Sequence, residues 1–409
     1  MAPSSSTPFA PETPPTQDAS PHAPESVWTR EYLRVLAVQA LFGLSFSAFL
    51  MLPKFLHVEL HASATEIGWV TAGALAVGAF AAPFAGPVSS RFAPRTLLLS
   101  GILGSAFASI AYLFVDSAGP LLYLLRFVQG LTYFIVFNTT ATMVADRVPP
   151  ARLSQAIGYL GLSMLATNAL APAVTEPLAD WIGWGPAFAS AGVVALVAVP
   201  LARALQGERA VATSVDRISG LDVGAPRLLA AYFTSGVVGV GLGTLFTFTQ
   251  PFALSLGAKR LGDFFFGYVG AAVVMRLLLV KLVDRVGPGR IALGALGLYG
   301  VVVLSASHLT PALLGLLGAG LGVAHGLIYP ALTAFTLADV GSDKRGAVMG
   351  WFTGAYHVGF SLSVLCLGPL ADATGFRPVF LIAGLIVMSA LWPLGRAVLG
   401  VRSRRALST

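Results

Sequence analysis

The sequence predicts an all-α integral membrane protein in which 12 transmembrane helices form two pseudo-symmetric six-helix bundles. Three observations predict this fold: the composition, the number of apolar stretches and an internal repeat. Hydrophobic residues make up 56% of the 409 residues and charged residues only 11%, with a mean hydropathy of +0.79. A soluble globular protein has about a quarter charged residues, so most of the exterior of this chain must face lipid.

Twelve predominantly apolar stretches are long enough to cross a bilayer, which takes about 20 residues per helix. Charged residues, Pro or Gly interrupt the chain between them, and the stretches lack the period-two alternation of a β-barrel strand. We therefore expect helical spans. Their approximate bounds are 33–54, 66–88, 96–115, 120–145, 153–176, 186–206, 228–254, 264–283, 290–308, 312–338, 347–370 and 377–399.

One segment occurs twice in the chain. "PLADWIGWGPAF" begins at Pro177 and "PLADATGFRPVF" begins at Pro369, 192 residues later, and seven of the twelve positions are identical. Because these prolines end the expected fifth and eleventh spans, the first six and the last six helices are predicted to be copies of one bundle. Six is an even number, so both copies have the same orientation in the membrane. Parallel repeats of this kind occur in transporters that open a central site alternately to the two sides.

The composition also predicts the domain boundaries. Residues 1–30 are rich in Pro, Ser and Thr and contain no apolar run, which predicts a disordered tail and not a cleaved signal peptide. The N-terminal bundle is expected over 31–206, a polar cytoplasmic linker over 207–226, the C-terminal bundle over 227–400 and a basic C-terminal tail over 401–409.

The basic residues predict the orientation. With the N-terminus inside, 19 of the 25 Lys and Arg residues fall in cytoplasmic segments, 4 in outer segments, including Lys54, and 2 within spans. This bias predicts a multi-pass protein of the cytoplasmic (inner) membrane with both termini in the cytoplasm. The basic residues lie between apolar runs and form no single patch, which argues against nucleic acid as a partner. With Cys366 as the only cysteine, cysteine-rich zinc sites are excluded.

Four short motifs carry a family resemblance. The segments "GPVSSRFAPR" (86–95) and "VKLVDRVGPGR" (280–290) both resemble the G-x-x-x-D-R-x-G-R loop signature of the major facilitator superfamily (MFS). "RFVQG" (126–130) is similar to its R-x-x-Q-G element, and "APAVTE" (171–176) resembles a degenerate G-P-x-x-G-G efflux motif. The resemblance covers residues 30–400, points to the drug and sugar efflux permeases, and implies the fold given above.

In this family the G-x-x-x-D-R-x-G-R loop forms a charged latch that stabilises one conformation. The resemblance places Asp284 and Arg285 in that role, with Arg91 as their counterpart in the first copy. The first copy departs from the signature, since Ser90 and Ala93 stand where the family has Asp and Gly. The alternative is that these arginines are ordinary anchors at the cytoplasmic face.

Charged and titratable residues inside spans usually face a cavity or a partner, because charges in the membrane are costly. The resemblance implies that helices 3, 6, 9 and 12 pack on the outside. The candidates all lie on other helices, and they are Arg126, Glu176, Arg276, His325 and His357. Arg126 and Glu176 fall at similar depth near the outer side. They are predicted to pair, either as an outer gate that exchanges a proton or as a static ion pair.

The remaining candidates concern a central cavity. Each histidine either binds substrate or carries a proton, or is a neutral side chain bonded to a nearby carbonyl. Hydrogen bonds to a substrate are expected from Gln129, Tyr133, Asn138 and Tyr356. Two further patterns are structural: glycines four residues apart on the tenth span predict close helix packing, and "SATE" (63–66) predicts a capping box.

These observations together predict a secondary transporter that moves a small organic solute by alternating access. Proton-coupled efflux is expected, with uptake by symport or facilitated diffusion as the alternative and a receptor or scaffold as the alternative of another class. The chain carries no HExxH, GxSxG or P-loop motif, so no enzymatic activity is expected. No cofactor or metal is expected, and the expected partners are the solute, protons and the lipid bilayer around a monomer.

Overall fold

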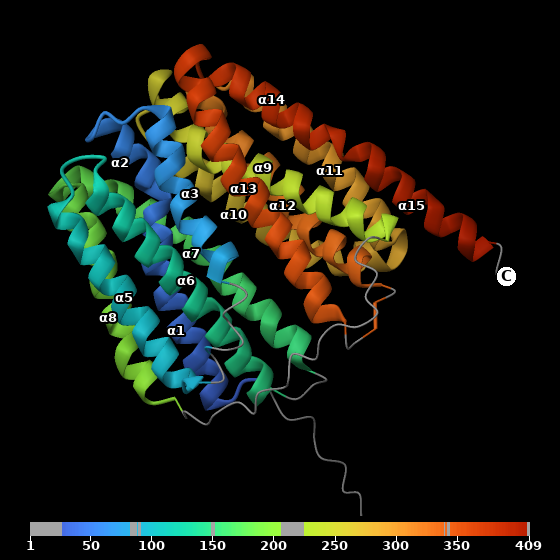
Figure 1. The fold of residues 1–409 in the computed structure, drawn as a ribbon, viewed down its shortest axis with the longest axis horizontal. Helices are drawn as coiled ribbons and strands as arrows, with labels where there is room; N and C mark the ends of the chain where they lie inside the picture. The colour runs from blue at the N-terminus through green and yellow to red at the C-terminus, as the bar shows by residue number, and fades with distance from the viewer. Residues whose placement is uncertain are drawn as a thin grey trace, which may run out of the picture.

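A computed structural model describes residues 27–81, 88, 91–148, 152–205, 225–338, 340–341 and 344–406. Most of the predicted N-terminal tail and of the predicted linker lies outside these residues, as do residues 407–409. The described residues form α- and 3-10 helices joined by short connections, without strands. Figure 1 shows the blue-to-green helices gathered in one bundle and the yellow-to-red helices in the other.

The described residues of the first half form six long helical segments, in agreement with the expected spans. The first of them is a helix that tightens into a 3-10 turn and then continues. The segments are α1 (Arg30–Ser47) with η1 (Ala48–Met51) and α2 (Leu52–Val58), α3 (Ala64–Ala81), α5 (Pro94–Ala111) with η3 (Tyr112–Phe114), α6 (Pro120–Arg147), α7 (Leu153–Ile182) and α8 (Trp184–Arg203).

The second half repeats this order. Its last span is divided into two helices, and α15 continues through Ala406, so part of the predicted C-terminal tail is helical. The segments are α9 (Pro226–Ser255), α10 (Gly262–Val286), α11 (Pro288–Ser305) with η5 (Ala306–His308), η6 (Pro311–Leu313) with α12 (Leu314–Leu337), α13 (Arg345–Thr374), and α14 (Phe376–Ser389) with α15 (Leu391–Ala406).

Length and apolar composition agree with a membrane protein. Ten helices or helix pairs of the described part are long and apolar enough to cross a membrane. The helices α3 and α10 occupy the positions of the second and eighth expected spans. Large apolar side chains are exposed on α5, α8, α11 and α14, for example Phe107, Val193, Val301 and Leu385. A surface of this kind fits lipid and not water.

The duplicated segment has the same backbone conformation in both copies. Gly183 and Gly375, which are 192 residues apart, have φ angles of +87° and +81°. Each donates its N–H to the carbonyl four residues earlier, on Ala179 and Ala371, and so ends one long helix where the next begins. Glycine is favoured in this left-handed conformation because it has no Cβ. The repeated sequence therefore encodes a repeated sharp reversal between α7 and α8 and between α13 and α14.

The predicted glycine packing is confirmed on the tenth span. A Cβ on Gly318 or Gly322 would overlap the carbonyl oxygens of Phe264 or Tyr268, so α12 and α10 pack backbone to backbone. The capping box is confirmed as well. The Ser63 Oγ accepts from the Glu66 N–H at 3.2 Å, and Glu66 accepts from the Ser63 N–H at 2.8 Å.

Candidate functional site

A cavity of about 210 Å³ lies between the two halves. The first half lines it with residues of α1, η1, α2, α3, α6 and α7, and the second half with residues of α9 and α13. Most of the lining is apolar or aromatic, as is usual for sites that bind organic ligands. Polar side chains contribute at a few points, and these are Ser47, Thr71, Arg126, Tyr133, Asn168, Thr247, Tyr356 and His357.

Arg126 lies at the wall of this cavity and is only 7% exposed. Its Nε donates to the Val70 carbonyl of α3 at 3.3 Å, and its Nη1 donates to the Gln129 Oε1 at 2.8 Å. Tyr112 donates to the same Gln129 oxygen at 3.3 Å. Gln129, predicted to contact substrate, thus lies one turn along α6 and holds the guanidinium in place. All of these partners are neutral.

The charge of Arg126 has no counter-charge among the described residues. The ion pairs in that part of the chain are Arg34–Glu31, Arg147–Glu31 and Lys54–Glu176. The cavity lining contains no Asp or Glu. A buried charge is costly unless it is paired, so a cavity with one unpaired guanidinium favours an anionic ligand group.

Two hydroxyl groups add hydrogen-bonding capacity to the cavity. The Oγ1 atoms of Thr71 on α3 and Thr247 on α9 are buried and have no hydrogen-bond partner among the described residues. Both residues line the cavity, one from each half. Buried polar groups usually have partners, so these two are available to a bound solute.

Aromatic rings form much of the remaining wall. Tyr133 stacks on Phe46 at a centroid distance of 4.4 Å, and Tyr356 packs edge-on against His357 at 5.7 Å. The structure therefore places Tyr133, Tyr356 and His357 at the cavity, where the sequence predicted them. This wall suits an apolar or aromatic ligand body.

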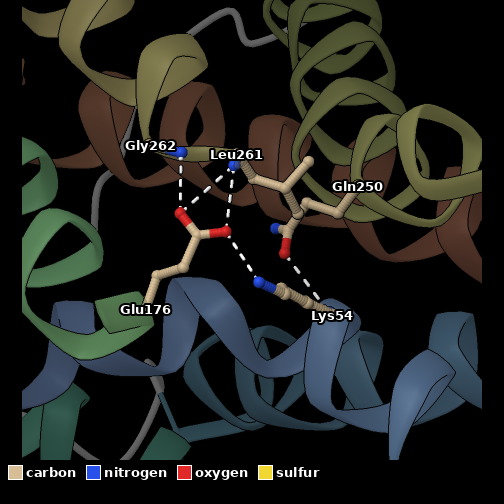
Figure 2. A network of polar contacts seen from close by, with 5 residues as sticks. All are labelled: Lys54, Glu176, Gln250, Leu261 and Gly262. Atoms are coloured by element: carbon tan, nitrogen blue, oxygen red, sulfur yellow. Dashed lines mark hydrogen bonds and ion pairs between the residues drawn. The ribbon is translucent and has the colours of Figure 1, made fainter. Parts of the chain in front are cut away.

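A buried ion pair joins two helices of the first half near the cavity (Figure 2). The Lys54 Nζ of α2 donates to the Glu176 Oε1 of α7 at 2.8 Å, with both side chains at least 90% buried. The predicted Arg126–Glu176 pair is wrong, because Arg126 bonds to neutral groups of α3 and α6 and Glu176 binds Lys54. Lys54, expected in an outer segment, is buried within the protein because the first span continues through η1 and α2.

Glu176 also binds the N-terminus of α10, which belongs to the other half. Its two oxygens accept the Leu261 N–H at 3.0 and 3.1 Å, and its Oε2 accepts the Gly262 N–H at 2.9 Å. Figure 2 shows the carboxylate between these two amides and the Lys54 ammonium. A carboxylate is stabilised at a helix N-terminus, where free N–H groups point outward. We call this arrangement of Lys54, Glu176, Leu261 and Gly262 the clasp.

Two more sets of hydrogen bonds join the halves at the same end of the molecule. Gln250 of α9 accepts from the Lys54 N–H at 3.2 Å and donates to the Leu50 carbonyl at 2.6 Å. Asp372 of α13 accepts the Ala64 and Thr65 N–H groups at 2.7 and 3.0 Å and so caps α3. We call the end that carries the clasp and these contacts the gate end. The predicted orientation makes it the outer end.

Arg276 and His325 lie on neighbouring helices of the second half. The Tyr268 hydroxyl and the His325 Nδ1 are 3.0 Å apart. Each of Arg276 and His325 is next in sequence to a residue of a close helix contact, since a Cβ on Gly326 of α12 would lie 3.3 Å from the Met275 Cβ of α10. The Arg276 Nε and the His325 Nε2 are buried and have no hydrogen-bond partner among the described residues. Neither residue is among those that line the cavity described above.

The other predicted residues have separate locations. Asn138 is exposed on α6, and its Nδ2 donates to the Phe134 carbonyl of the same helix at 2.8 Å. Arg91 is exposed in the short described stretch before α5. Asp284 and Arg285 fall in the last turns of α10, where their side chains lie outside the described residues.

Sequence reasoning missed several residues of the site. Lys54 could have been found as a lone ammonium within an otherwise apolar stretch, "FLMLPKFL". For Thr71, Asn168 and Thr247 the sequence offers no signal, because neutral polar residues are frequent in spans and only the fold shows which of them face a cavity. Gln250 likewise becomes notable only through its contacts across the halves.

The comparison with family models decides the identity of the fold. The model of the Major Facilitator Superfamily matches residues 35–262 and 228–407. The chain belongs to this superfamily. The predicted MFS fold and the resemblance to its efflux branch are thereby confirmed, and the protein is a multi-pass membrane transporter and not an enzyme.

Bacterial relatives are named as an export protein and as multidrug resistance proteins. The staphylopine export protein of Staphylococcus aureus is 24% identical, over 87% of this chain and 93% of its own length. The multidrug resistance protein MdtG of Yersinia enterocolitica is 26% identical, over 93% of this chain and 97% of its own length.

Solved MFS structures show the same fold at low identity. The nucleoside transporter NupG has a TM-score of 0.75 at 13% identity and covers 90% of this chain and 99% of its own. A bacterial homologue of the human lysosomal transporter Spinster, solved in an inward-facing and occupied conformation, has a TM-score of 0.71 at 14% identity. It covers 90% of this chain and 96% of its own.

Proposed function

We propose that this MFS protein exports a small organic solute with an anionic group and an apolar body, in exchange for protons, by alternating access. The observation that carries the proposal is Arg126, a buried guanidinium at a cavity between the halves with only neutral partners among the described residues. A carboxylate, sulfonate or phosphate on the solute would supply the missing counter-charge in a site of low dielectric constant.

The cavity wall supports the rest of the proposed cargo. Apolar and aromatic side chains surround the space, and the free hydroxyls of Thr71 and Thr247 come from opposite halves. A solute that binds both halves is released or retained as the halves move, which is the requirement for alternating access. A volume of about 210 Å³ suits a small ligand.

The gate end supports a rocking movement of one half against the other. Lys54 and Glu176 both belong to the first half, so their ion pair remains when the halves separate. What breaks on separation is the docking of α10 onto Glu176, together with the Gln250 and Asp372 contacts. The Glu176 carboxylate, held by Lys54, therefore remains in place as an acceptor for the N-terminus of α10, and the clasp can form again after each cycle.

We assign proton coupling to Glu176. Protonation of its carboxylate removes the charge that attracts the N-terminus of α10 and weakens the ion pair with Lys54, so a proton bound there favours an open gate end. Export is the proposed direction because the named relatives are a staphylopine exporter and multidrug resistance proteins.

Transport in proteoliposomes tests the anion site. Matched probes are radiolabelled aromatic sulfonates and their uncharged sulfonamides, since sulfonates do not cross the bilayer as neutral acids. We expect counterflow of sulfonates only, with about a tenfold or greater loss in Arg126→Gln and partial retention in Arg126→Lys. Arg377→Gln, an exposed arginine of α14, is the control and should be unchanged. Undiminished sulfonate counterflow by Arg126→Gln, or equal transport of both probe classes by the wild type, would refute the proposal.

A pH gradient tests the coupling. The wild type should accumulate sulfonate in the more acidic compartment, against the sulfonate concentration gradient. Glu176→Gln should catalyse exchange of sulfonate but no uphill transport. Uphill transport by Glu176→Gln at wild-type level would remove Glu176 from the proton pathway. Accumulation of sulfonate in the less acidic compartment, in the direction of proton flow, would favour uptake by symport over export.

A further inference from the structure

The second half contains a polar cluster that the contacts of the described residues leave incomplete. The Arg276 Nε and the His325 Nε2 are buried and lack hydrogen-bond partners in that part of the chain. None of the three ion pairs among the described residues includes Arg276. Arg276 therefore resembles Arg126 in the first half, a positive charge inside the bundle without a counter-charge.

Tyr268 orients this cluster for a ligand. Its hydroxyl lies 3.0 Å from the His325 Nδ1. When Tyr268 donates in this hydrogen bond, the His325 Nε2 carries the hydrogen and becomes a donor on the part of α12 that packs against the Arg276 region of α10. A guanidinium and an imidazole N–H on packed helix segments can both donate to the oxygens of a carboxylate or phosphate.

The cluster lies directly behind the cavity wall. Tyr268 packs edge-on against Phe246 at 5.4 Å, and Tyr329, beside His325, packs against Tyr356 at 6.2 Å. Phe246 and Tyr356 both line the cavity. A movement of these two rings would therefore join the cavity to the cluster.

The two arginines lie at different depths. Arg126 is six residues from the start of α6 at the gate end, whereas Arg276 is 14 residues from the start of α10 at the same end. At 1.5 Å per residue these positions are about 9 and about 21 Å deep, a difference of about 12 Å. Arg276 also reaches the other half, because a Cβ on Gly161 of α7 would lie 3.5 Å from its Nη1.

We infer that Arg276 and His325 form a second anion subsite, and that the cargo is an elongated dianion whose two acidic groups bind Arg126 and Arg276. This inference rests on the proposed function, since it assigns the far end of the same solute. A dianion of this length connects the first half to the second, so its binding holds the two halves together about the cavity.

Ligand-induced thermal stabilisation of the full chain in nanodiscs tests the inference. The probes are linear α,ω-dicarboxylates of increasing length and the monoamide of each, which differ only in one charge. The wild type should bind the longer diacids about tenfold more tightly than their monoamides, and the short diacids no better than theirs. Arg276→Gln should lose this preference, so that each diacid binds no more tightly than its monoamide. Arg276→Lys should keep part of the preference and His325→Gln should weaken it.

The controls separate this inference from the proposed function. Arg377→Gln should retain the wild-type preference. Arg126→Gln should bind every monoanionic probe more weakly, which tests the first site independently of the second. If Arg276→Gln keeps the wild-type preference, or if no diacid binds better than its monoamide, the second subsite is overturned while the Arg126 site still stands. If Arg126→Gln binds all anions normally, the proposed function itself fails.

Discussion

Four charged side chains inside the described bundles fall into two groups with different roles. Lys54 and Glu176 neutralise each other and are further satisfied by backbone N–H groups of α10. Arg126 and Arg276 have no counter-charge among the described residues. A satisfied pair can stabilise a conformation, whereas an unsatisfied charge provides binding energy for a ligand. We therefore assign the first group to gating and the second to cargo binding.

Substitution of Glu176 tests the gating group. Glu176→Gln leaves the Lys54 ammonium buried without a counter-charge and should lower the free energy of unfolding by about 3 kcal/mol. Lys54→Met combined with Glu176→Gln should recover much of this loss. The exchanged pair, Lys54→Glu with Glu176→Lys, should not recover it, because an ammonium cannot accept the Leu261 and Gly262 N–H groups and faces the positive end of α10. Thermal unfolding in nanodiscs measures all three, and full recovery by the exchanged pair would contradict the role of the α10 N-terminus.

At the residue scale the sequence predicted that Arg126 and Glu176 face the protein interior better than it predicted their partners. Residue type and location within a span identified Arg126 and Glu176, but depth counted along separate helices could not show that a 3-10 turn brings Lys54 to Glu176 first. Asn138, expected to bind substrate, does not line the cavity, and its amide donates to a carbonyl of its own helix. The partner of a charge depends on helix rotation, which the sequence does not encode locally.

Among the helices, α3 and α10 have equivalent positions but are held at the gate end by different residues. Asp372 caps α3, whereas its repeat mate Asp180 makes no hydrogen bond among the described residues, and α10 is capped by Glu176 one turn earlier on α7. The repeat is visible in the sequence but this asymmetry is not, since it arises from the acid at position 176 where the second copy has Gly368.

Removal of Asp372 tests this difference between the copies. Asp372→Ala leaves two N–H groups of the α3 N-terminus without acceptors and should lower the stability by about 1 kcal/mol. Asp180→Ala is the matched control and should have little effect, since Asp180 makes no hydrogen bond among the described residues. Melting temperatures of the two variants measure the difference. Equal losses would contradict the assigned cap.

Close packing of α9 and α13 gives a second prediction for the helices. A Cβ on Gly359 would overlap the Gly236 carbonyl oxygen, so Gly359→Ala should separate the helices and lower the stability by about 1–3 kcal/mol. Gly354→Ala, five residues earlier on α13, has no atom within 4 Å and should cause no loss. Thermal unfolding of the two variants checks this, and a loss confined to Gly354→Ala would show that the packing is misassigned.

At the scale of the whole molecule, the sequence predicted the architecture because hydrophobic length and internal repetition are global signals that do not depend on any single contact. Twelve spans and two similar halves followed from them. The MFS family followed from the resemblance of four short motifs, which the family model confirms. The closed gate end did not follow, because Gln250, Asp372 and the clasp join residues far apart in the chain whose proximity depends on the conformation.

The central claim is that the halves must separate at the gate end during each transport cycle. Thr65 and Asp372 lie on opposite halves with their oxygens 2.5 Å apart. In a Cys366→Ser background, cysteines at both positions can be joined by a short bis-methanethiosulfonate reagent, which forms a disulfide with each thiol and releases sulfinate, so that a reducing agent reverses the cross-link. A control cross-link between positions 31 and 34, within α1, leaves the halves free.

The measurement is sulfonate counterflow before cross-linking, after it and after reduction. We expect that cross-linking positions 65 and 372 abolishes counterflow and that reduction restores it, while the α1 cross-link has no effect. Undiminished counterflow with the halves fully cross-linked would contradict it.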